Sequence, residues 1–199
     1  MEFDFKRTVQ ISAYLLLVLA VTQALYTALY VAQLPVPRQL LWGLETVLFT
    51  FLAALAGAAL VQAKTFHLGW SAIAFSAVLN VVQVSIGLAL FGPFREVAAQ
   101  LETFAPAAES IVAVSFLIYY AAKVLLGFAA LVFGMAVLKE GSSGLGRLTV
   151  GVAMLAMVAN TTLILFSREG FLPSPVAGGS GVLATFFLGV CLLKLNRQA

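Results

Sequence analysis

Charged residues are scarce in this chain of 199 residues: only 10% are Asp, Glu, Lys or Arg, whereas 62% are hydrophobic. Globular domains average about 25% charged residues, because their surface faces water. Eleven basic and eight acidic side chains cannot cover a soluble domain of this size. The scarcity excludes a soluble enzyme and a disordered protein. The net charge of +3, divided among short loops, also argues against a nucleic-acid binder.

Cysteine and histidine are almost absent. A single cysteine, Cys191, excludes an intrachain disulfide, and a single histidine, His67, lies far from it in the sequence. These two side chains cannot supply the usual ligand sets of zinc or haem sites. We therefore predict no metal and no cofactor, and we identify no catalytic residues.

Long apolar runs, in contrast, are abundant. The hydrocarbon core of a bilayer is about 30 Å thick and needs about 20 residues of helix to cross it. Six segments meet this requirement: roughly 9–34, 40–63, 66–91, 111–138, 145–166 and 176–195. The sequence therefore predicts an all-α integral membrane protein. We expect one transmembrane domain over residues 1–199, a bundle of six helices arranged as three hairpins.

The segment between the third and fourth predicted spans shows a helical pattern of its own. Gly92 and Pro93 are expected to end the third span, because proline lacks the backbone N–H that continues a helix. Apolar side chains then recur every three or four residues, at Phe94, Val97, Leu101 and Phe104. This pattern predicts a separate amphipathic helix lying in the outer membrane interface.

Basic residues indicate the orientation. With six spans both termini lie on one side, and that side carries seven basic residues: Lys6, Arg7, Lys64, Lys139, Arg147, Lys194 and Arg197. The opposite side carries three: Arg38, Arg95 and Arg168. Because basic residues accumulate on the cytoplasmic side, we expect a plasma (inner) membrane protein with both termini in the cytoplasm.

Two ionisable residues remain inside the spans, Lys123 and Glu45. Such groups cost about 2.5–3.5 kcal/mol at a helix centre on insertion scales, so each is a candidate for function. For Lys123 the alternatives are a functional site in the bundle interior, snorkelling to the outer interface, or a structural ion pair. For Glu45 the alternatives are an interfacial pair with Arg38 or a partnership with Lys123.

Other polar side chains fall at related depths, between mid-membrane and the outer side. The predicted ligand-binding set is Lys123, Glu45, Asn80, Gln83, Asn160, Gln23 and Tyr119. One amide in a span commonly joins two helices. Several at one depth favour a hydrated pocket that opens outward. We therefore predict binding or transport of a small polar or anionic solute, with Lys123 at the centre of the pocket.

The first span also carries a ridge of small residues, Ala20, Ala24 and Ala28, which permits close approach of another helix or a partner subunit. The size, six spans, ridge and outward pocket are similar in architecture to the substrate-binding subunits of energy-coupling-factor vitamin importers. Two other functions stay open: an accessory or assembly subunit of a larger membrane complex, and an intramembrane enzyme acting on lipid.

Overall fold

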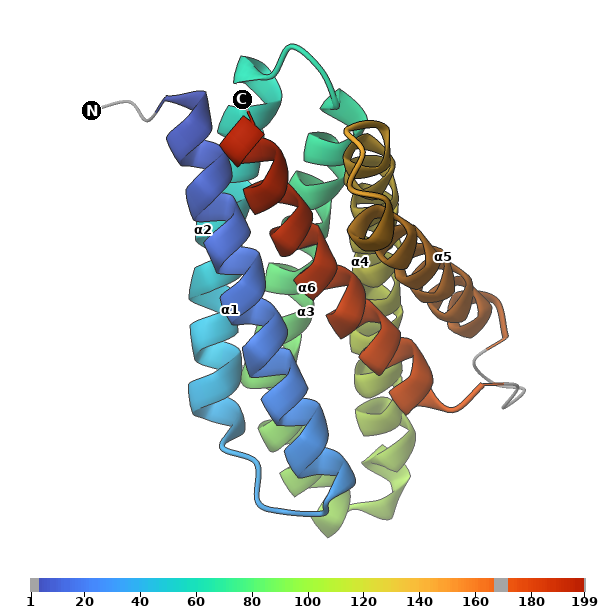
Figure 1. Ribbon diagram of the computed structural model, residues 1–199. Coiled ribbons are helices and arrows are strands. Elements are labelled where there is room, and N and C mark those ends of the chain that lie inside the picture. Colours follow the sequence, from blue (N-terminus) through green and yellow to red (C-terminus); the bar gives the residue numbers. More distant parts are fainter. Residues whose placement is uncertain (1–3, 167–171, 199) are drawn as a thin grey trace.

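The computed structural model describes residues 4–166 and 172–198, and every regular element in this part of the chain is a helix (Figure 1). The elements are α1 (Phe5–Val31), α2 (Arg38–Gln62), α3 (His67–Gln100), the short 3-10 helix η1 (Glu102–Phe104), α4 (Ala105–Lys139), α5 (Ser143–Phe166) and α6 (Ser174–Gln198). The six α-helices of the described segments are long and apolar enough to cross a membrane. This confirms the predicted all-α, multi-pass class. Arg168 lies outside the described residues.

Each helix contacts its neighbours in sequence, and the last helix packs against the first. α3 lies between α2 and α4, α4 also contacts α5 and α6, and α1 contacts α2 and α6. The described chain ends lie together at one end of the molecule, beside the α2–α3 and α4–α5 connections (Figure 1). The α1–α2 turn and η1 lie at the other end. We call these the terminal end and the distal end.

The terminal half of the molecule is an apolar core. Trp70 of α3 packs edge-on against Phe133 of α4, with ring centroids 5.4 Å apart. Phe66 lies 5.6 Å from the same Phe133 ring. Gly69 makes this contact possible, since a Cβ atom there would lie 2.7 Å from the Phe133 ring. Close packing of large rings against small residues is how apolar helices associate in lipid, where water supplies no driving force.

The third helix does not end where the sequence predicts. α3 continues through Pro93 to Gln100, so the segment contains no separate interfacial helix, and only the turn η1 connects α3 to α4. Contacts on both sides of Pro93 stabilise the extension: Arg95 lies over the Phe91 ring, and the Phe94 ring packs 5.3 Å from Phe104. Proline removes one backbone hydrogen bond, and here these contacts offset that loss.

Candidate functional site

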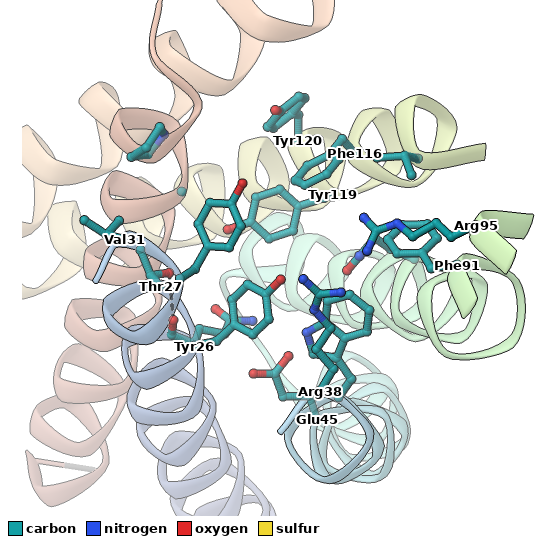
Figure 2. A pocket seen from close by; sticks show the side chains of 17 residues that line it. Tyr26, Thr27, Val31, Arg38, Glu45, Phe91, Arg95, Phe116, Tyr119 and Tyr120 are labelled. Carbon is teal, nitrogen blue, oxygen red and sulfur yellow. Dashed lines mark hydrogen bonds between the residues drawn. The ribbon is translucent and has the colours of Figure 1, made fainter. Parts of the chain in front are cut away.

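A cavity of about 360 Å³ opens in the distal half, between α1, α2, α3, α4 and the start of α6 (Figure 2). Its lining combines aromatic rings with polar and charged groups. The polar and charged lining residues are Gln23, Tyr26, Thr27, Tyr30, Arg38, Glu45, Gln83, Arg95, Tyr119 and Tyr120. Small-molecule sites are commonly cavities of about 300–1,000 Å³ with a few polar groups on apolar walls.

The first two turns of α2 form one wall. Arg38, Trp42 and Glu45 recur at spacings of four and three residues, so all three share one helix face. The Arg38 Cζ atom lies 6.0 Å from the Trp42 ring centroid, within cation–π range. Trp42 fits there because α3 has Gly87 at the contact: a Cβ atom would lie 2.6 Å from the Trp42 Cζ3 atom.

The distal part of α3 forms the facing wall. Gln83, Gly87, Phe91 and Arg95 recur every fourth residue and therefore form one row along the helix. The Arg95 Cζ atom lies 5.8 Å from the Phe91 ring centroid, and the Phe91 ring packs edge-on against Trp42 at 5.8 Å. The side chains of Arg38 and Arg95 extend toward the same space in Figure 2. The continuation of α3 past Pro93 is what brings Arg95 to this wall.

Lys123 lies behind the cavity. Its side chain is fully buried, so it does not snorkel to the interface. The Nζ atom donates a 2.6 Å hydrogen bond to Gln23 Oε1 and lies 5.2 Å from the Tyr119 ring centroid. Gly181 of α6 provides room for it, because a Cβ atom there would lie 2.8 Å from Lys123 Cδ. Gln23 and Tyr119 both line the cavity, so Lys123 contacts two of its wall residues.

Glu45 is the buried carboxylate of the cavity. Only 5% of its surface is exposed, and its Oε1 atom has no hydrogen-bond partner. The Thr22 side chain hydrogen-bonds the carboxylate, and the positive charge of Lys123 attracts it. No ion pair within 4 Å joins this carboxylate to the Lys123 ammonium group, although the structure describes both side chains. The Lys123 Nζ atom hydrogen-bonds Gln23 Oε1 instead. Glu45 is therefore a lining residue of the cavity whose Oε1 atom is buried and accepts no hydrogen bond.

The structure divides the predicted binding residues into two groups. Gln23, Glu45, Gln83 and Tyr119 line the cavity, whereas Lys123, Asn80 and Asn160 are buried outside the lining. Asn80 donates within α3, to Ser76 O and Oγ, whereas Asn160 of α5 donates to Ala156 O of its own helix and to Ala177 O of α6.

Sequence reasoning missed Arg95 as a cavity residue and treated Arg38 only as a possible partner of Glu45. The signal was the spacing of residues on one helix face: Arg38 precedes Trp42 by one turn, and Arg95 continues the row from Gln83 through Phe91. The expected helix end at Pro93 concealed the second row. A row that continues across a proline favours an unbroken helix over two helices.

The alanine ridge of α1 is not one continuous surface. Ala20 is 3% exposed and is covered by the chain's own helices, whereas Ala24 and Ala28 are exposed. Only the distal part of the ridge is accessible to a partner subunit or to lipid.

The cavity offers charge and hydrogen bonds. The described residues contain no group of three or more His, Cys, Asp or Glu side chains that could hold a metal. Guanidinium groups bind carboxylate and phosphate oxygens through paired N–H donors, and amide and phenol groups add directional hydrogen bonds. Comparison of the chain with protein-family models, with curated proteins and with solved structures found no match.

Proposed function

We propose that this protein binds a small anionic or polar solute in the distal cavity and transports it across a membrane. The observation that carries the proposal is the presence of two guanidinium groups, Arg38 and Arg95, beside one 360 Å³ cavity in a largely apolar molecule. Charged groups are expensive near lipid and are retained there mainly for function. Their placement on two facing helices favours an anionic group bound between them.

The proposed topology puts the cavity on the outer side. The six helices form three hairpins, both termini lie in the cytoplasm of a plasma-membrane protein, and the distal end faces outward. The excess of basic residues on the terminal side supports this orientation.

Cysteine labelling tests the orientation. Cys191 is fully buried, so its replacement by alanine gives a cysteine-free background. Glu102 and Lys64 are both exposed and lie on opposite ends of the molecule. In intact cells we expect a membrane-impermeant maleimide to label Glu102→Cys and to spare Lys64→Cys until the cells are broken. The reverse pattern overturns the orientation.

In this proposal Lys123 acts through the residues that it holds. Its ammonium group fixes the Gln23 amide by a 2.6 Å hydrogen bond and adds positive potential behind the cavity. In a low dielectric this potential offsets part of the Glu45 charge and favours entry of an anion. Lys123→Met removes both effects while it keeps the length and the apolar stem of the side chain.

Binding of matched probes tests the function. The probes are 3-phenylpropanoate, phenyl phosphate and the uncharged 3-phenylpropanol, applied to purified protein in lipid nanodiscs. We expect at least one anion to bind more tightly than the alcohol, and Lys123→Met to weaken that anion about tenfold. Uptake of the bound anion into proteoliposomes then tests transport. Equal binding of the three probes, or anion binding unchanged in folded Lys123→Met protein, overturns the proposal.

A further inference from the structure

We propose that the cavity is built for a small zwitterion that carries an anionic group, an ammonium group and a short apolar body. This inference rests on the proposed function and narrows the substrate class. It is drawn from two features with opposite charge in one cavity: the guanidinium groups of Arg38 and Arg95, and the unpartnered carboxylate oxygen of Glu45.

The two arginines form the anion subsite. Each guanidinium lies about 6 Å from the centroid of an aromatic ring, Trp42 for Arg38 and Phe91 for Arg95. The Arg38 side chain interacts with the Tyr26 phenol, which also lines the cavity, and Arg95 lies on the opposite wall. Contact with an aromatic ring restricts each arginine side chain, which lowers the entropy lost when an anion binds.

Glu45 forms the ammonium subsite. Its side chain is 95% buried, and Oε1 accepts no hydrogen bond. A buried acceptor without a donor costs about 1–3 kcal/mol, which a donor on the ligand recovers. A ligand that carries only negative charge leaves Oε1 unsatisfied and faces the repulsion of the carboxylate. An ammonium group supplies both the hydrogen bond and the opposite charge.

The spacing of the two subsites suits a short molecule. Arg38 and Glu45 are seven residues apart on α2, which is about 10 Å along the helix axis. The Arg38 guanidinium lies over Trp42, one turn closer to Glu45, so the two charges are separated by about 5 Å along the axis. Aromatic rings of Trp42, Phe91 and Tyr119 line the space around them and provide contacts for the apolar body and the ammonium group.

Two sets of matched probes test the substrate class. The first set is phenylalanine, 3-phenylpropanoate and 2-phenylethylamine, and the second is 4-aminobutyrate, butanoate and butylamine. Binding is measured by calorimetry on the protein in nanodiscs. A second measurement is Trp42 fluorescence in a Trp70→Phe variant, since the chain has only two tryptophans. In at least one set, we expect the zwitterion to bind about tenfold or more tightly than both of its partners.

Glu45→Gln identifies the ammonium subsite. In this variant we expect the zwitterion to bind less than about twofold more tightly than the amine-free acid. The affinity for the acid itself should be unchanged or higher. Glu109→Gln, at an exposed carboxylate outside the cavity on α4, is the matched control and leaves the advantage of the zwitterion over the acid unchanged.

The outcomes separate the two proposals. If the amine-free acids bind as tightly as the zwitterions, or if Glu45→Gln keeps the full advantage, the zwitterion proposal is wrong and the anion-binding proposal stands. If none of the six probes binds, the zwitterion proposal is wrong, whereas the anion-binding proposal stands if phenyl phosphate binds more tightly than 3-phenylpropanol. If only the amines bind and phenyl phosphate does not, both proposals are wrong.

Discussion

The two halves of this molecule use the same helices for different purposes. In the terminal half, the Trp70 and Phe133 rings are almost fully buried and pack against each other, with Gly69 in contact with Phe133. In the distal half, arginine, glutamate, glutamine and tyrosine side chains surround an open cavity. The residues that stabilise the fold and the residues that can bind a solute therefore lie on the same helices, at opposite ends of the molecule.

Lys123 lies at the boundary between the two halves. Its backbone neighbours on α4 include Ala122, whose carbonyl oxygen accepts a 2.8 Å hydrogen bond from Ser76 Oγ, and its own side chain reaches Gln23 on α1. One turn further along α4, Leu126 belongs to the apolar core. A buried ammonium group at this depth therefore connects the packed half to the cavity walls.

The largest effect expected from a single substitution is on stability, in the terminal half. Phe133→Ala removes a ring that is 2% exposed and packed against Trp70, and large-to-small changes of this kind cost about 3–5 kcal/mol. Phe116→Ala, at a cavity ring that is 43% exposed, is expected to cost less than about 1 kcal/mol. Unfolding in detergent followed by circular dichroism measures both. Equal losses would contradict the division between the halves.

The largest effect on binding is expected in the distal half. The double substitution Arg38→Gln and Arg95→Gln removes both guanidinium groups of the cavity, and charge-assisted hydrogen bonds contribute about 1.5–3 kcal/mol each. We expect the affinity for the tightest anionic or zwitterionic probe to fall about 100-fold or more, with little change in unfolding. Arg147→Gln, an exposed arginine of α5 outside the cavity, is the control. A similar loss in the control would show a general charge effect instead of a site.

The apolar architecture could be predicted from the sequence because it depends on length and hydropathy alone. Each of the six predicted spans overlaps one of the apolar helices of the described chain. The end of the third helix could not be predicted in this way. Proline weakens a helix locally, and whether the helix continues depends on tertiary contacts, here those of Arg95 with Phe91 and of Phe94 with Phe104.

The candidate site was predicted only in part, for a related reason. Polar residues inside spans were recognised by their cost in lipid, which identified Glu45, Gln23 and Gln83. That criterion does not distinguish a side chain that lines a cavity from one that joins two helices, as Asn160 does through Ala177 O. It also omits charged residues near helix ends, where Arg38 and Arg95 lie. Their role depends on the direction in which long side chains extend, which packing decides.

A smaller effect is expected where the two walls of the cavity meet. Gly87→Ala places a Cβ atom 2.6 Å from Trp42 Cζ3, so the Trp42 ring must move, and with it the Arg38 guanidinium that lies over the ring. We expect about a tenfold loss of affinity and a stability change of about 1 kcal/mol or less. Titration of the same probe and the same unfolding assay measure the two effects. An unchanged affinity would show that the position of Trp42 is not important for binding.

The smallest effect is expected at glycines that contact nothing. Gly43 lies next to Trp42 on α2, and Gly151 lies on α5; at both positions an added Cβ atom has no neighbour within 4 Å. Alanine is favoured over glycine in a helix interior by about 1 kcal/mol, so Gly43→Ala and Gly151→Ala should stabilise the fold slightly and leave affinity unchanged. Gly43→Ala is the sharper control for Gly87→Ala, because it adds the same methyl group beside the same cavity wall. If it also weakened binding, helix rigidity rather than the displacement of Trp42 would explain the effect of Gly87→Ala.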